Sequence, residues 1–200
     1  KAFIAGADIK EFSKMKIKDR KAMKEDWRVT DVISNSKKPV IAMINGFCLG
    51  GGLEIAMACD LRTASDNSKL GQPEINIGII PGAGGTQRLT KLVGEGRSME
   101  LILTGNMISA TKAESWGLVN LVTDEKQLEE KTMEIATLIA QKSPFAVERA
   151  KKSVKLASNT NLKKGLKKEQ ELFVECFKSN DGKEGIAAFI EKRKPEFKGN

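Results

Sequence analysis

Residues 39–60 read PVIAMINGFCLGGGLEIAMACD, and this stretch decides the fold class. Its first part, residues 40–44, is an almost unbroken apolar run after a proline, which is typical of a parallel strand covered on both faces. Three consecutive glycines at 50–52 then lead directly into an apolar segment at 53–58 that predicts a helix. A buried strand, a glycine turn and a helix in this order favour an α/β fold.

The glycine turn also predicts a place where an anion binds. Glycine has no Cβ, so a ligand atom can approach the backbone closely. The first N–H groups of the following helix have no partner within the helix and carry partial positive charge. Such a turn suits a phosphate or an oxyanion that forms during a reaction. The spacing matches neither a dinucleotide fingerprint nor a P-loop, and a plain packing turn stays open as an alternative.

A second turn could supply the other arm of an anion site. Residues 2–5 have the pattern of a strand end, and Gly6-Ala7-Asp8 follows as a turn in which Asp8 caps a helix. Anion holes usually pair donors from two segments, so the backbone N–H groups of this turn are candidates. Taken alone, an ordinary helix cap explains the turn as well.

Two glutamates are candidates for acid–base chemistry. Glu54 lies among apolar residues just after the glycine turn, and Glu74 follows a proline in another apolar neighbourhood. Two carboxylates in such surroundings repel each other, so at least one should have a raised pKa. That suits the pair to hold and activate one water from two sides. The alternative for any single glutamate is an exposed or structural position.

Composition narrows the chemistry further. The chain has 200 residues, 40% hydrophobic and 30% charged, which is typical of one globular domain with a sizeable core. There is no histidine, and the three cysteines form no CxxC, so histidine-based nucleophile pairs, zinc sites and a disulfide framework are not expected. Three unpaired cysteines favour a reducing, cytoplasmic setting. No apolar run reaches the roughly 18 residues of a membrane span.

Charge is uneven along the chain. The net charge is +8, and residues 151–200 hold 13 Lys and Arg against 7 Asp and Glu, which leaves +6 in the last quarter. A basic excess favours an anionic partner, either a phosphorylated ligand or nucleic acid, although a solvated lysine-rich face explains it as well.

The pattern of elements changes near residue 95. Residues 1–95 alternate strands and helices, with a helix over 19–35 and short strands over 60–64 and 68–71. Residues 96–200 are mainly helical and are expected to complete the core and to support oligomerisation. The helices predicted in this second region cover 96–104, 110–116, 126–142, 144–157, 162–178 and 182–192.

Several runs resemble the crotonase, or enoyl-CoA hydratase/isomerase, family, and its bacterial-type hydratases in particular. The similarity extends over essentially the whole chain. It is carried by 2–10 (AFIAGADIK), 39–60, 71–89 (GQPEINIGIIPGAGGTQRL), 101–105, 113–122 and 189–194.

The resemblance implies a specific site. The family's oxyanion donors match the N–H groups of Ala7 and Gly51, its two catalytic glutamates match Glu54 and Glu74, and the glycine beside the reacting water matches Gly82. Its coenzyme A contacts match Ala7, Asp8, Ile9 and Lys10. Phe189 and Lys192 match a C-terminal helix that contacts the nucleotide end, often of a neighbouring subunit.

It also implies a spiral of ββα units with a helical C-terminal trimerisation region, and a homotrimer or a hexamer made of two trimers. Coenzyme A would be part of the substrate, as in fatty-acid β-oxidation, with no permanently bound cofactor and no metal.

The match departs from the family in two places. Leu53 stands where many hydratases have a smaller residue or cysteine, which could reshape the acyl pocket. Family members also begin about a quarter of a chain earlier, so we expect the first strands to be missing, a sheet edge to be exposed and the activity of this chain alone to be weak.

Three functions follow as hypotheses. The first is reversible hydration of 2-enoyl-CoA to 3-hydroxyacyl-CoA, for which hydratases resemble this chain in having both glutamates. The second is double-bond isomerisation through the same enolate, which needs only one carboxylate. The third is RNA binding by the basic C-terminal helices. Because the lysines are dispersed and no RNP-like aromatic pattern occurs, nucleic acid is not expected to be the main partner.

Overall fold

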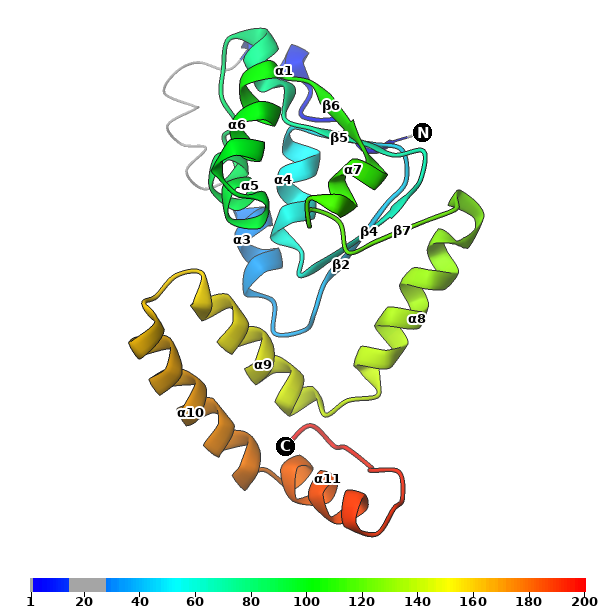
Figure 1. The fold of residues 1–200 in the computed structure, drawn as a ribbon, viewed down its shortest axis with the longest axis vertical. Coiled ribbons are helices and arrows are strands. Elements are labelled where there is room, and N and C mark those ends of the chain that lie inside the picture. The colour runs from blue at the N-terminus through cyan, green and yellow to red at the C-terminus, as the bar shows by residue number, and fades with distance from the viewer. Residues whose placement is uncertain (1, 15–27) are drawn as a thin grey trace. The chain divides into compact units, whose positions relative to one another are not determined.

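The computed structural model describes residues 2–14 and 28–200 (Figure 1). Contacts within the chain group it into two compact units, one of Lys1–Ser36 with Val40–Thr132 and one of Lys37–Pro39 with Met133–Asn200. Helices that follow residue 95 therefore belong to both units, and the division of roles expected near residue 95 stays a prediction. The helix predicted over 19–35 lies partly outside the described residues.

The first unit contains two small sheets. The four-stranded sheet has the order β1-β3-β5-β6, and the three-stranded sheet has the order β2-β4-β7. All neighbouring strands are parallel except β6, which runs antiparallel to β5. The strands are β1 (Ala2–Ile4), β2 (Ile41–Ile44), β3 (Phe47–Leu49), β4 (Leu61–Ser65), β5 (Lys69–Gly71), β6 (Met107–Ser109) and β7 (Leu121–Thr123).

Strand β2 forms where the apolar run predicts it, but only one of its faces is fully buried. Ala42 and Ile44 are buried, whereas Met43 between them is 39% exposed. The strand pairs in parallel with β4, as expected, and it lies at the edge of the three-stranded sheet. The prediction that both faces of this strand are covered is therefore wrong. Side chains alternate between the two faces of a strand, and the face that carries Met43 is partly open.

Helices surround these sheets in the first unit. The central one is α4, an apolar helix whose Leu53 and Ala56 are fully buried in the core with Ile44, Leu70 and Leu89. Packing against these apolar neighbours stabilises α4, which explains why a segment of eight residues forms a helix without a side-chain cap. The helices and 3₁₀ turns of this unit are α1 (Ile9–Lys14), α3 (Arg28–Asn35), α4 (Gly51–Ala58), η2 (Pro73–Ile77), α5 (Gly85–Val93), α6 (Glu95–Thr104), α7 (Ala110–Ser115) and η3 (Glu125–Gln127).

The register of the four-stranded sheet positions the site. Ile4 of β1 pairs with Cys48 of β3, and Leu49 at the end of β3 pairs with Gly71 at the end of β5. Parallel strands in register end at the same edge of the sheet. The chain segments that follow the three strands therefore emerge side by side, at the edge where α/β folds usually bind ligands.

Four helices make up most of the second unit, with the start of α8 belonging to the first (Figure 1). Three of them begin at side-chain caps, in which Ser143, Asn161 and Ser179 each accept from a backbone N–H three residues later, at 2.9–3.1 Å. The helices are α8 (Leu128–Ala140), α9 (Pro144–Ala157), α10 (Leu162–Lys178) and α11 (Asn180–Ile190).

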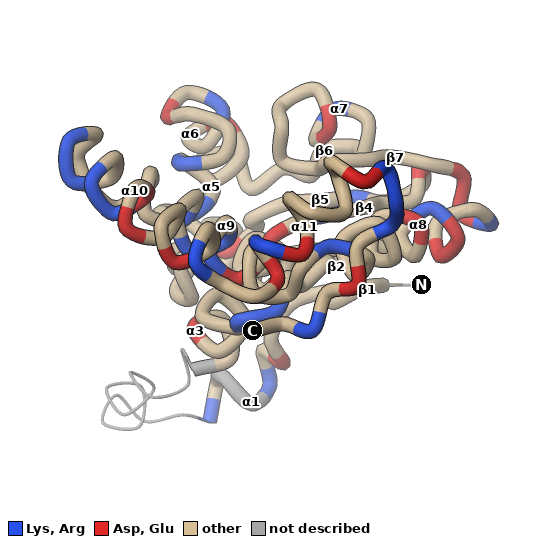
Figure 2. Tube along the Cα trace, turned by 90° about the horizontal axis from the view of Figure 1, so that it is seen from below, with Lys and Arg blue, Asp and Glu red and all other residues tan. Residues whose placement is uncertain are grey.

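Basic and acidic residues both occur along these helices, and on α10 the lysines of 163–168 come before the glutamates of 169–175, as Figure 2 shows. Lys168 on α10, for example, pairs with Glu171 at 2.7 Å. Across the described parts of the chain, no helix is long and apolar enough to cross a membrane.

Candidate active site

The turn before α4 requires glycine at position 50. Gly50 has φ +53° and ψ −124°, a conformation that residues with a side chain rarely adopt. Its N–H donates to the Gly71 carbonyl at 2.9 Å, which ties the end of β3 to the end of β5. A Cβ at this position would lie only 3.0 Å from Oε1 of Glu74. The turn is thus shaped so that its backbone passes directly beside a carboxylate.

The expected oxyanion donors lie on adjoining segments. Gly51 is the first residue of α4, and no atom lies within 4 Å of the place where its Cβ would be. Ala7 is exposed on the segment after β1. A Cβ at Gly52 would overlap the Ile4 carbonyl, so the end of β1 packs directly against the first turn of α4. The exposed segment after β1 and the half-buried Gly51 therefore meet at the amino end of this helix.

The segment after β1 continues as predicted. The Asp8 carboxylate accepts from the Lys10 N–H at 2.8 Å and caps α1. Ala7, Asp8, Ile9 and Lys10 are all exposed, so a ligand can reach them.

Glu54 is buried on α4 and is fixed by backbone donors. Its side chain is 3% exposed, and Oε1 accepts from the N–H groups of Ala83 at 2.6 Å and Gly85 at 2.7 Å. Gly85 is the first residue of α5, so the carboxylate lies at the positive end of that helix. A Cβ on Gly85 would lie 3.0 Å from Oε1 of Glu54 and 2.8 Å from the side-chain amide of Gln72, which makes glycine necessary here.

Glu74 is half-buried in the first turn of η2. With its amide nitrogen turned toward the carboxylate, the fully buried Gln72 donates to both oxygens of Glu74, at 2.9 and 3.1 Å. Burial raises the pKa of Glu74, and the negative charge of Glu54 raises it further, while a backbone hydrogen bond opposes the shift. The prediction that at least one of the two glutamates has a raised pKa is confirmed.

The structure thus gathers Glu54, Glu74 and the glycine turn in one place. The residues predicted for the site did not include Gln72, nor the N–H groups of Ala83 and Gly85. Apolar residues flank the GQPE run, with Leu70 before it and Ile75 after it. They were the one signal that could have indicated a buried amide at Gln72. The expected Gly82 is exposed on the loop just before Ala83, with no atom within 4 Å of its Cβ position.

The structure also describes three more residues that the sequence analysis names. Leu53 is fully buried in the core, and its effect on an acyl pocket stays a prediction. Phe189 and Lys192 belong to the second unit, where the side chain of Phe189 is 85% exposed and Lys192 follows α11. No three His, Cys, Asp or Glu side chains come together as metal ligands within residues 2–14 and 28–200.

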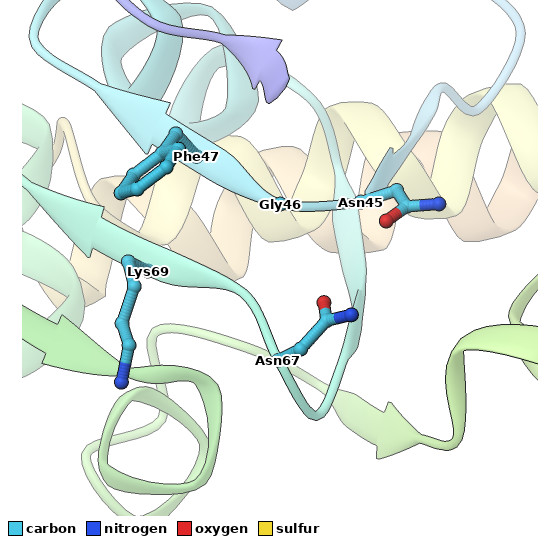
Figure 3. A pocket seen from close by; sticks show the side chains of 5 residues that line it. All are labelled: Asn45, Gly46, Phe47, Asn67 and Lys69. Atoms are coloured by element: carbon cyan, nitrogen blue, oxygen red, sulfur yellow. The ribbon is translucent and has the colours of Figure 1, made fainter. Parts of the chain in front are cut away.

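A separate cavity of about 290 Å³ lies at the opposite end of the sheet (Figure 3). It is lined by Asn45, Gly46, Phe47, Asn67 and Lys69, and Phe47 and Lys69 are the first residues of β3 and β5. The amides of Asn45 and Asn67 both donate to the carboxylate of Glu125, at 3.4 and 2.8 Å. Because this cavity contains neither candidate glutamate, it is distinct from the candidate active site.

Known proteins match this chain along its whole length. The model of the family described as enoyl-CoA hydratase/isomerase matches residues 1–200. The mitochondrial enoyl-CoA hydratase of Pongo abelii is 46% identical over 200 residues, which cover 99% of this chain and 68% of that protein. The short-chain-enoyl-CoA hydratase of Clostridium acetobutylicum is 46% identical over 197 residues, which cover 98% and 76%.

A solved structure agrees in fold. The crystal structure of enoyl-CoA hydratase from Bacillus anthracis superimposes with a TM-score of 0.93 at 44% identity, and the match covers 98% of this chain and 76% of that one. The expected crotonase-like α/β fold is thereby confirmed. On its sequence and on its fold, the chain belongs to the enoyl-CoA hydratase/isomerase family.

Proposed function

We propose that the protein catalyses the reversible hydration of 2-enoyl-CoA thioesters to 3-hydroxyacyl-CoA. The observation that carries this proposal is the pair of carboxylates beside one glycine turn, each with its own donors. Glu54 is held by two backbone N–H groups and Glu74 by the amide of Gln72. Two fixed carboxylates suit a reaction in which a water must be both oriented and deprotonated while a second proton is delivered.

The thioester carbonyl oxygen accepts from the N–H groups of Ala7 and Gly51, and this polarises the conjugated double bond. Charge that develops on the oxygen is stabilised by preorganised donors at the amino end of α4. Removal of one such donor typically slows catalysis by roughly 100- to 1,000-fold. The position of Gly51 should therefore matter about as much as either glutamate.

Water then adds across the double bond. Glu54 takes a proton from the water as its oxygen bonds to C3, and the π electrons move toward C2 and the thioester carbonyl. Glu74 delivers a proton to C2, so that one water is added in total and the two carboxyl groups exchange protons before the next turnover. The raised pKa of Glu74, caused mainly by burial, supports its role as the acid.

Both carboxylates are held in place, which supports hydration over isomerisation, since an isomerase needs only one of them. The test is product analysis by mass spectrometry with crotonyl-CoA and with a 3-enoyl-CoA. Formation of 3-hydroxybutyryl-CoA from crotonyl-CoA supports hydration. Migration of the double bond without gain of water would overturn it.

The remaining features are proposed from the family resemblance. The coenzyme A part of the substrate contacts Ala7, Asp8, Ile9 and Lys10, and its nucleotide end contacts Phe189 and Lys192. The protein forms a homotrimer or a hexamer, and Gly82 lies beside the reacting water. The cytoplasmic location stays a prediction.

A further inference from the structure

The turn after α11 holds a lysine in a conformation that usually requires glycine. Lys192 has φ +55° and is the one non-glycine residue with positive φ in the described parts of the chain. The N–H of Arg193 donates to the Ala188 carbonyl at 3.0 Å, and that of Lys192 donates to the Phe189 carbonyl at 3.3 Å. This is the Schellman ending of a helix, in which the left-handed position is normally glycine because a Cβ is strained there.

The carboxylate of Glu184 clamps this turn. It accepts from both terminal nitrogens of Arg193, at 2.6 and 2.9 Å, and from the N–H of Glu196 at 2.9 Å. Two parallel hydrogen bonds between a guanidinium and a carboxylate fix geometry as well as charge. The hydrogen bonds from Arg193 and then from the Glu196 N–H lower the pKa of Glu184 to about 2, so this clamp persists over the working pH range.

One helical turn earlier, Asp181 holds the end of the chain. Asp181 is 3% exposed, and its carboxylate accepts from the Ser143 hydroxyl at 2.6 Å, from the Lys198 N–H at 2.7 Å and from the Gly199 N–H at 3.0 Å. The Asp181 N–H in turn donates to the Asn200 carbonyl at 3.0 Å. Residues 193–200, which we term the C-terminal strap, are therefore tied to the first turns of α11.

The strap also packs against α11 and against the first residue of α9. A Cβ on Gly185 would lie 3.3 Å from the ring of Phe197, and one on Gly199 would lie 3.6 Å from the ring of Pro144. The exposed Lys192 thus occupies a strained position within a turn that is fixed from both sides. Strain of this kind persists only where the surroundings enforce it, and it is most often found where a side chain has a task.

We propose that Asp181 and Glu184 are positioning residues that hold the C-terminal strap and the turn at Lys192, so that this ammonium group meets the phosphates of coenzyme A. The inference rests on the proposed function, because the resemblance assigns Lys192 to the nucleotide end of the substrate. It adds the reason why a lysine stands where glycine would be more stable, and it names the groups that offset the strain.

The first experiment compares two substrates that differ only in the nucleotide. Crotonyl-CoA carries the phosphates and crotonyl-pantetheine does not. In Glu184→Gln we expect KM for crotonyl-CoA to rise roughly fivefold at unchanged kcat, since loss of substrate binding alone affects KM, and KM for crotonyl-pantetheine to stay constant. The matched control is Glu171→Gln on α10, which breaks an exposed ion pair with Lys168 away from the strap. The proposal would be overturned if KM changed equally for both substrates, or if it changed for neither.

The second experiment uses Lys192→Gly. Glycine relieves the strain at positive φ, so we expect a higher melting temperature together with a KM for crotonyl-CoA that rises as in Glu184→Gln. A residue with only a structural role would not lose substrate affinity while the protein gains stability. A higher melting temperature with unchanged KM contradicts the proposal. Because this variant removes strain, it also decides the matter if Glu184→Gln fails to fold.

Failure of the proposed function gives a different result. In that case the unaltered protein hydrates neither thioester. If only the positioning role is wrong, the unaltered protein still hydrates both thioesters. In that case Glu184→Gln and its control Glu171→Gln show the same KM values.

Discussion

The side-chain amide of Gln72 donates to both carboxylate oxygens of Glu74, at 2.9 and 3.1 Å, and it does so from a fully buried position. Hydrogen bonds to a carboxylate favour its charged form, so Gln72 partly offsets the burial that raises the pKa of Glu74. The same two bonds fix the direction of the carboxylate. Gln72 is thus positioned to set both the geometry and the proton affinity of one proposed catalytic group.

Gln72→Met should therefore raise the pKa of Glu74 and lower kcat by roughly 10- to 100-fold, because a group that orients a ligand or base typically contributes this much. The measurement is the pH profile of kcat/KM, in which the ionisation of Glu74 should move to higher pH. Gln87→Met is the control, since Gln87 is exposed on α5. A profile that coincides with that of the unaltered protein would contradict the assignment.

Replacement of either glutamate should stop hydration while the fold survives. We expect Glu54→Gln and Glu74→Gln each to lower kcat for crotonyl-CoA by about 100- to 10,000-fold, which is the usual contribution of general acid–base catalysis. In Glu54→Gln the amide oxygen of the new side chain can still accept from the backbone at Ala83 and Gly85, so circular dichroism should stay unchanged. Glu100→Gln, at an exposed pair with Lys112, serves as the control. Near-normal turnover in either variant would reject its role.

Gly85→Ala tests the close approach behind Glu54. The added methyl would crowd the Pro81 ring at 2.6 Å, the side-chain amide of Gln72 at 2.8 Å and Oε1 of Glu54 at 3.0 Å. We expect a loss of about 1–3 kcal/mol in the free energy of unfolding, as is typical of overpacking, and a reduced kcat. Chemical denaturation and steady-state assays measure the two effects.

Gly96→Ala is the matched control, because it lies in α6 with no atom within 4 Å of its Cβ position. That change should be neutral or stabilise the helix by up to about 1 kcal/mol. Equal behaviour of the two alanine variants would show that the space around Gly85 does not constrain the site.

Stability should depend on pH through Glu74. Its pKa is raised above the unfolded value of 4.5, so the folded state binds this proton more tightly than the unfolded state does. The resulting stability is fully present below about pH 4.5 and is lost as the pH rises through the folded-state pKa. Glu74→Gln lacks the charge and should escape this loss.

The variant's melting temperature should therefore exceed that of the unaltered protein at neutral pH, and the difference should shrink as the pH falls toward 4.5. Melting curves across this range measure it, with Glu100→Gln as the reference for an exposed carboxyl. A difference that stays constant with pH would mean that the Glu74 charge does not oppose folding.

Much of the fold could be predicted because its signals are local. The helix predicted over 144–157 has the bounds that the structure gives α9, since Ser143 and the proline after it mark the start. The glycine turn and α4 follow equally from the 39–60 run. By contrast, β6 and β7 have three residues each, too few to show a period. Their formation depends on pairing with β5 and β4, which are distant in sequence.

The candidate site likewise has residues that the sequence could predict and contacts that it could not. Glu54 and Glu74 could be predicted from their residue type and apolar surroundings, with the family resemblance to choose between roles. The donors that hold Glu54 could not, because Ala83 and Gly85 lie 29 and 31 residues along the chain and contribute only backbone atoms. Helix α5 was missed for a related reason. Its first turn has no capping side chain of its own, and its first N–H is satisfied by Glu54.

Through its hydrogen bonds to the start of α5, the side chain of Glu54 has two roles. It is a proposed catalytic group, and it also holds the loop before that helix in place. A descendant of this protein that lost the carboxyl group would also have to find new acceptors for two amide hydrogens in the loop. Exchange to aspartate would shorten the reach and leave that loop unanchored, whereas glutamine would preserve the anchor and abolish only the proposed proton transfer. New activities on this scaffold should therefore arise more readily by neutral replacement at position 54 than by its truncation.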